Sequence, residues 1–102
     1  MPMDSSKTVI LEVVNLTYHS QKDEEAFFEW VQKIKSVTNI GGHGDVDTIS
    51  VNMDIVDQDD VRELLALFHR YGVDKKQLVT LVKPEYHAWF HDKEKYWYSD
   101  IF

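Results

Sequence analysis

Few residues of this chain have both the type and the spacing that catalysis or metal binding needs. His43, Asp45 and Asp47 alternate along one short stretch that glycines flank. An imidazole and two carboxylates in that pattern could hold a divalent cation or position a general base. The same three residues also suit a turn that water solvates. They are therefore kept as candidate metal ligands, and no metal site is predicted from them.

A second pair of possible metal ligands, His87 and His91, is separated by four residues. On a helix, this spacing would place both side chains on one face. On a strand, the two residues would lie about 13 Å apart, which is too far for one ion. The aromatic residues around the pair favour strands, so we do not expect the two histidines to share a metal.

The strong signatures of nucleotide-binding and hydrolytic enzymes are missing from the sequence. It contains no P-loop, no Gly-x-Ser-x-Gly elbow, no Gly-x-Gly-x-x-Gly run and no cysteine. We expect no cofactor and no catalytic residues, and a binding protein is favoured over an enzyme. Without cysteine there are no disulfides, which fits a reducing compartment. Because no basic and apolar leader and no long apolar run is present, we expect the cytoplasm and no membrane contact.

The charge of the chain is more informative. Its 102 residues include 18 acidic and 11 Lys or Arg residues, which gives a formal net charge of −7. Proteins that bind nucleic acid directly need a basic surface, so we expect a basic protein partner instead. No Lys or Arg lies between Lys35 and Arg62. This interval contains six aspartates: Asp45, Asp47, Asp54, Asp57, Asp59 and Asp60. The alternative is that they are helix caps and a solvated turn, and those at 45–47 and 57–60 need not form one patch.

The segment at 48–55 is the element around which these residues must be arranged. Its apolar and polar side chains alternate, which predicts a strand with one buried face. The run at 8–18 is apolar on both faces and predicts a central strand. A short strand is expected at 38–47, ending in a glycine-rich turn, and a further strand at 78–82, which Pro84 ends.

Two helices are predicted between these strands. The first begins after Ser20 and buries an apolar stripe of Phe27, Trp30, Val31, Ile34 and Val37. The second has Asp57 as N-cap, Asp60 at the capping-box position and Gly72 as C-terminal residue. The resulting order, β-α-β-β-α-β, predicts a ferredoxin-like α+β fold for residues 7–84, a four-stranded antiparallel sheet with both helices on one face. Residues 1–6 are expected to be a flexible leader.

Residues 85–102 form an aromatic extension. It contains seven aromatic residues: Tyr86, Trp89, Phe90, Tyr96, Trp97, Tyr98 and Phe102. Two short strands and a turn are predicted, with a helix over 85–92 as the alternative. The extension is expected on or beside the same domain. It could cover the second face of the sheet or serve as a recognition surface, because Trp and Tyr dominate binding hot spots. The candidate partner-binding residues are Tyr86, Trp89, Tyr96, Trp97 and Tyr98, together with the six aspartates.

A compact acidic domain with clustered aromatics and no catalytic signature is similar, in type and not in motif, to small bacterial proteins that neutralise a basic enzyme such as a toxin nuclease. The leading hypothesis is an immunity or inhibitor protein that presents the carboxylates of 45–60 and the aromatics of 86–98 to a cationic site. One alternative is a dimeric ferredoxin-like enzyme or small-ligand domain, with His19, His43 or a histidine of the extension in an aromatic pocket. Another is a regulatory domain that modulates a larger enzyme. Monomer and homodimer both stay open.

Overall fold

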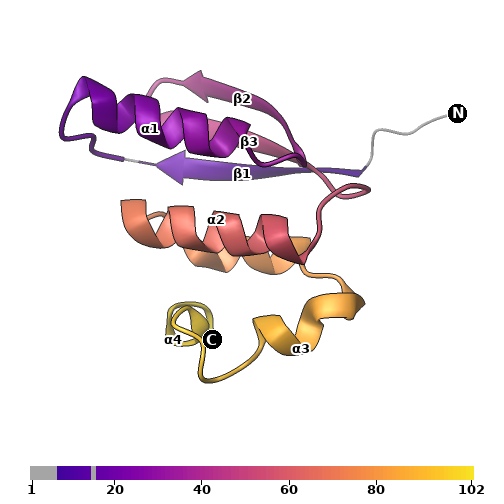
Figure 1. Ribbon diagram of the computed structural model, residues 1–102. Helices are drawn as coiled ribbons and strands as arrows, with labels where there is room; N and C mark the ends of the chain where they lie inside the picture. Colours follow the sequence, from indigo (N-terminus) through magenta and orange to yellow (C-terminus); the bar gives the residue numbers. More distant parts are fainter. Residues whose placement is uncertain (1–6, 15) are drawn as a thin grey trace, which may run out of the picture.

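The computed structural model describes residues 7–14 and 16–102 and shows a mixed α+β fold (Figure 1). The expected leader at 1–6 lies outside the described residues. The strands and longer helices are β1 (Thr8–Val14), α1 (Gln21–Gln32), β2 (Val37–His43), β3 (Val46–Asn52) and α2 (Gln58–Tyr71). They are followed by two 3-10 helices, η2 (Lys75–Leu81) and η3 (Pro84–Tyr86), and by the short helices α3 (His87–Phe90) and α4 (Tyr98–Ile101).

The sheet has three antiparallel strands in the order β1-β3-β2. The strand expected at 48–55 is central, as β3, but it ends at Asn52, whose side-chain oxygen accepts a hydrogen bond from the Asp54 N–H at 2.8 Å and starts the turn into α2. Leu11 of β1 is paired with Ile49 of β3. The prediction that the first strand is central is wrong, because β1 forms one edge of the sheet.

The predicted fourth strand at 78–82 is also wrong, so the ferredoxin-like fold is matched only loosely. Residues 75–81 form the 3-10 helix η2, and Asp74 caps it by accepting from the Lys76 N–H at 2.9 Å. Leu78 and Leu81 are fully buried, and their spacing of three residues puts both on one face of a 3-10 helix. In place of a strand, the side chain of Gln77 is bonded to the free edge of β1.

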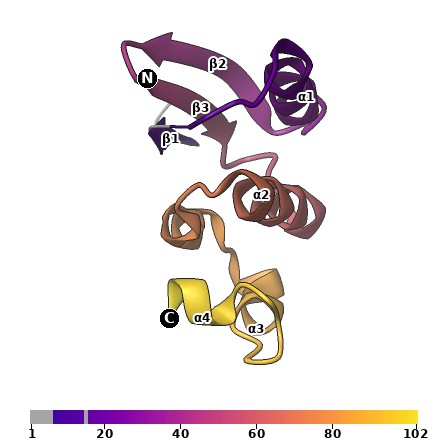
Figure 2. The same ribbon diagram turned by 90° about the vertical axis from the view of Figure 1, so that its left-hand side faces the viewer.

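Both long helices begin as their capping residues predict, and α2 also ends at the predicted Gly72. The first helix is shorter than expected: α1 ends at Gln32, so Ile34 and Val37 of the predicted stripe lie beyond it. Ser20 accepts from the Asp23 N–H at 3.1 Å, and Asp57 accepts from the Asp60 N–H at 3.0 Å. Gly72 has the left-handed conformation, with φ 73°, that favours glycine after a helix. The two helices lie on one side of the sheet (Figure 2). The core between the sheet and these helices consists mainly of fully buried apolar residues of β1, β3, α1 and α2. They are Leu11, Val13, Phe27, Val31, Ile49, Val51, Val61, Leu64, Leu65 and Phe68.

The aromatic extension is helical, so the predicted pair of short strands is wrong and the helical alternative for 85–92 is closer. It packs below α2 and η2, on the side away from the sheet (Figures 1 and 2). It therefore does not cover the second face of the sheet, where Ile10 and Val14 of β1 are 54% and 51% exposed. In the part of the chain that the structure describes, no helix is long and apolar enough to cross a bilayer.

Candidate functional site

The proposed metal ligands at the β2–β3 turn are only partly visible in the structure. The side chain of His43 lies outside the described residues. Asp45 is exposed, whereas Asp47 is partly buried and lies over Gly42, where a Cβ atom would be 2.6 Å from the Asp47 Oδ1. Both aspartates line a hollow of about 210 Å³. Among the described residues, no three His, Cys, Asp or Glu side chains are close enough together to hold a metal.

His87 and His91 are not separated as a strand would separate them. Helix α3 and the residue after it bring the two rings into a stack with centroids 3.9 Å apart. The His91 Nδ1 lies 2.9 Å from the His87 carbonyl oxygen, so this nitrogen already has a partner. The expected distance of about 13 Å is therefore wrong, because the local structure is helical.

The aspartates around the start of α2 act largely within the protein. Lys35 donates to Asp57 at 2.7 Å and to Asp60 at 3.0 Å. The ammonium group of Lys35, followed by the Asp60 N–H, holds the pKa of Asp57 below its ordinary value. Asp59 is paired with Arg62 on the next turn of the helix. Asp54 is exposed beyond β3.

The six aspartates do not come together into one surface. The turn that carries Asp45 and Asp47 lies at one end of β3, and residues 54–60 follow the other end. The first group has no ion pair with any described residue, whereas Asp57, Asp59 and Asp60 all do. Among the described residues, the aspartates of this interval without an ion pair are therefore those of the β2–β3 turn and Asp54.

The aromatic extension offers less surface than its composition indicates. Trp97 is 3% exposed and donates from Nε1 to the Phe90 carbonyl oxygen at 2.9 Å. Tyr86 is also buried, and its hydroxyl donates to the Leu81 carbonyl oxygen at 2.8 Å. The guanidinium of Arg62 lies over the partly buried Trp89. Tyr98 is partly buried. Of the five candidate aromatic residues, only Tyr96 is largely exposed, at 49%.

A different acidic surface lies on α1, and we call it the α1 groove. It is a shallow hollow of about 340 Å³, lined by Gln21, Glu24, Glu25, Phe28, Glu29 and Gln32. Phe28 is partly buried against Phe27, with ring centroids 5.3 Å apart. None of the three glutamates forms an ion pair with a described residue. The signal in the sequence was Phe28 on the polar side of the helix, with glutamates four and three residues before it and one directly after it.

Tyr18 is affected both by a glutamate of the α1 groove and by an aspartate of the β2–β3 turn. Burial, and then the charges of Asp47 and Glu24, raise the pKa of Tyr18 to about 12. These two carboxylates come from different elements, α1 and β3, and both act on the same phenol. The Tyr18 hydroxyl is buried and has no hydrogen-bond partner among the described residues. Tyr18 also packs against Phe28, with centroids 6.2 Å apart.

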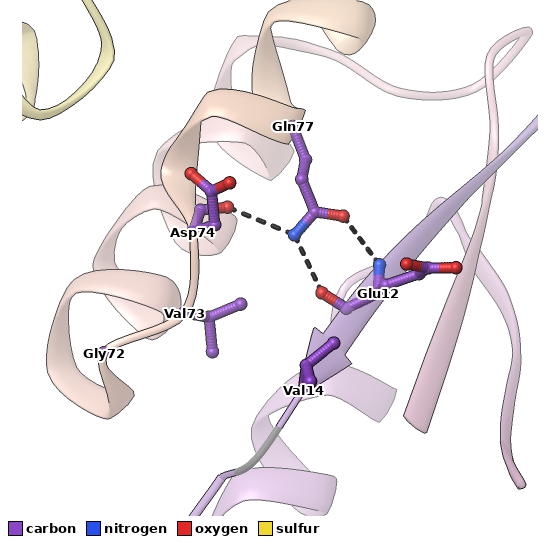
Figure 3. Close-up of a pocket in the computed structure, with 6 residues that line it drawn as sticks. All are labelled: Glu12, Val14, Gly72, Val73, Asp74 and Gln77. Carbon is purple, nitrogen blue, oxygen red and sulfur yellow. Dashed lines mark hydrogen bonds between the residues drawn. The ribbon is translucent and has the colours of Figure 1, made fainter. Parts of the chain in front are cut away.

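Two further hollows are polar. One, of about 440 Å³, is lined by Thr17, His19, Asp23, Arg70 and Tyr71. The other, of about 380 Å³, lies beside the free edge of β1. Figure 3 shows that the side chain of Gln77, from η2, is hydrogen-bonded there to the backbone of Glu12. Tyr71 is the one aromatic residue that lines either hollow, so neither resembles the aromatic pocket of the small-ligand hypothesis.

No family model matches this sequence, and comparison with curated proteins and with solved structures finds no significant similarity. What the chain defines by itself is a three-stranded α+β domain with an acidic, aromatic-floored groove on its first helix.

Proposed function

We propose that this protein is a small acidic binding domain that recognises a basic protein through the α1 groove. The observation that carries the proposal is the gathering of Glu24, Glu25 and Glu29 around Phe28, without an ion pair to any described residue. A partly exposed aromatic ring with a rim of carboxylates is suited to a Lys or Arg side chain. The methylene groups would lie on the ring while the charged head meets the rim.

Two of the groove glutamates, Glu25 and Glu29, support a role in binding, because their positions oppose the stability of the helix. Glu25 and Glu29 are like charges four residues apart, which destabilises a helix by about 0.2–0.5 kcal/mol. Glu29 also lies in the last turn, which contains no basic residue, although the helix dipole favours cations there. An arrangement that weakens its own helix is better explained by an external partner than by folding.

The α1 groove is a better binding surface than the two that the sequence indicates. The carboxylates at the start of α2 are already bonded to Lys35 and Arg62. The exposed aromatics Tyr96 and Phe102 lie with the extension, on the far side of α2 from the sheet (Figure 2). The turn with Asp45 and Asp47 remains part of the proposed surface, because Asp47 and Glu24 both act on the phenol of Tyr18.

The partner that fits this surface is an enzyme with a cationic cleft, such as a bacterial toxin nuclease. An immunity or inhibitor protein of this kind acts by occluding the cleft, and it needs no chemistry of its own. The net charge of −7 accelerates encounter with a basic partner, and salt screens that attraction. We place this activity in the cytoplasm, since a chain without cysteine needs no oxidising compartment.

The proposal is tested with an arginine-rich peptide and with the basic proteins that the purified protein retains from a lysate at low salt. The groove variant is Glu24→Gln, Glu25→Gln and Glu29→Gln combined. The matched control makes the same charge change at three exposed, unpaired glutamates elsewhere, Glu12, Glu85 and Glu94.

We expect the groove variant to bind the peptide at least about tenfold more weakly than the control, with a thermal midpoint equal to or above that of the wild type. Phe28→Ala should weaken binding as well. Equal losses in both triple variants would show that net charge alone attracts the peptide, and binding that salt does not weaken would contradict the proposal.

A further inference from the structure

We propose that two copies of this chain associate through the free edge of β2, with the two β2 strands antiparallel, so that their sheets join into one of twice the width. The inference is argued from the backbone of β2 and not from the glutamates of the α1 groove, although the two surfaces share Gln32 and the turn that carries Asp45 and Asp47.

The two edges of the sheet are treated differently by the rest of the chain. At β1, Gln77 accepts from the Glu12 N–H and donates to the Glu12 carbonyl oxygen, both at 2.7 Å (Figure 3). At β2, a hollow of about 300 Å³ lies beside the first residues of the strand. It is lined by Gln32, Val37, Thr38, Asn39 and Ile40. The edge of β1 is closed by a side chain, and that of β2 is open.

The register shows which backbone groups of β2 face outward. Gln77 bonds to the backbone N–H and C=O of Glu12, so these two groups point away from β3. The backbone N–H and C=O groups of the other even-numbered residues of β1 point the same way. Leu11 is paired with Ile49, so the backbone N–H and C=O groups of the odd-numbered residues of β3 point towards β1. Those of the even-numbered residues of β3 point towards β2. These even residues are paired with Asn39 and Gly41.

The backbone N–H and C=O groups of Asn39 and Gly41 thus point towards β3. Those of the alternate residues, Ile40 and Gly42, therefore point away from the sheet. A two-fold axis at Gly41 would pair Ile40 of each copy with Gly42 of the other. Each such pair exchanges two backbone hydrogen bonds. This is the same pairing that the strand makes with β3 on its inner side.

The composition of β2 favours a second copy as the occupant. Edge strands are usually protected from one another by charged residues or proline, and β2 has neither. In a chain of net charge −7, an edge without charge is a place where two copies can approach. Antiparallel pairing also brings the residues before β2 in one copy, with the exposed Lys33, towards the turn at 44–47 of the other, with two aspartates. A parallel arrangement would instead place like charges together.

The first experiment measures solution mass by light scattering and sedimentation from about 1 μM to about 1 mM, the range of affinities that small interfaces show. We expect the mass to rise from the 12.0 kDa of one chain to twice that value. Hydrogen exchange at the same concentrations should show the amides of Ile40 and Gly42 becoming protected as the mass rises. A monomer throughout, or unchanged exchange at both amides, would overturn the proposal.

Substitutions locate the contact. Ile40→Pro removes an outward N–H of β2, and Ile10→Pro removes an outward N–H of β1 as the matched control. We expect only the first to give a monomer. Loss of the dimer with Ile10→Pro alone would place the contact elsewhere and overturn the proposal.

A pair of surface charge reversals tests the same contact if proline perturbs the strand. Lys33 and Asp45 are both exposed. Lys33→Glu should weaken the dimer from about 2-fold to about 30-fold, because the symmetric interface contains the exposed charge contact twice. Adding Asp45→Lys should restore it. A dimer whose affinity neither reversal changes would contradict the antiparallel arrangement.

Discussion

Replacing Gln77 should reveal how much the single side chain that stands in for a fourth strand contributes to stability. Its amide makes two hydrogen bonds of 2.7 Å to the backbone of Glu12, and a third of 3.2 Å to the Asp74 carbonyl oxygen. A hydrogen bond contributes about 0.5–1.5 kcal/mol net, so loss of the two bonds to β1 should lower the free energy of unfolding by about 1–3 kcal/mol. This is the expected effect of Gln77→Ala.

Gln77→Glu gives a sharper result, because it keeps the shape and removes the donor. The carboxylate can still accept from the Glu12 N–H, but its second oxygen faces the Glu12 carbonyl oxygen without a proton between them. The neutral acid restores the donor, so folding raises the pKa of the introduced carboxyl. The variant should therefore be destabilised at neutral pH and should recover stability, relative to wild type, as the pH falls towards the ordinary pKa of about 4.3.

Urea unfolding, followed by circular dichroism and tryptophan fluorescence at several pH values, measures both effects. The control is Gln32→Ala, because Gln32 is exposed and its side chain has no hydrogen bond to a described residue. It should change stability by less than about 0.5 kcal/mol. If Gln77→Ala matches this control, or if Gln77→Glu is equally destabilised at low and neutral pH, then the amide does not hold the edge of β1 as described.

Three further outcomes are expected. Phe68→Ala should cost about 3–5 kcal/mol in a urea titration because Phe68 is fully buried, whereas Phe102→Ala, at a half-exposed ring, should cost much less. Asp57→Asn keeps the N-cap but loses a carboxylate whose pKa Lys35 lowers; wild-type stability should therefore fall more steeply than that of the variant below about pH 4. Tyr18→Phe should remove one phenol from the absorbance titration above pH 10 and reduce the loss of stability between about pH 10 and 12, to which Tyr71, Tyr86 and Tyr96 also contribute because burial raises their pKa values. It should not destabilise the protein at pH 7, since the hydroxyl has no described partner.

The helices were predictable because their signals are local. Ser20 and Asp57 accept the N–H groups that N-caps accept, and Gly72 has the conformation that few other residues adopt easily. Each of these interactions spans only a few residues, so no tertiary information is needed to infer it. The central strand β3 was found for a similar reason, because its buried and polar side chains alternate along the chain.

The fourth strand was not predictable in the same way. The sequence at 78–82 has the β-branched and apolar composition of a strand, but Leu78 and Leu81 also suit one face of a 3-10 helix. The 3-10 helix is accompanied by a long-range contact at the preceding residue: Gln77 bonds to Glu12, which is 65 residues away in the sequence. An interaction of that range leaves no periodicity from which it could be inferred. The position of β1 at an edge follows from the same contact.

The extension misled through its composition. Aromatic residues favour strands in general, yet here they are placed by contacts within the extension and with α2. Trp97 bonds to the Phe90 carbonyl oxygen, and Tyr96 packs against His69 with ring centroids 4.8 Å apart. The α1 groove was missed for a different reason: each glutamate of α1 has an ordinary explanation alone, and the site exists only because Phe28 packs against Phe27 and Tyr18.

The two proposals together have a consequence that neither has alone. A dimer formed at β2 would contain two copies of the α1 groove, and a partner with two basic sites, or one immobilised at high density, would bind both at once. Binding should then be tighter to an immobilised basic peptide than to the free peptide, and Ile40→Pro should remove that difference while leaving affinity for the free peptide unchanged. The groove variant should weaken both measurements. A separate effect of each substitution would show that recognition depends on the α1 groove and self-association on the edge of β2.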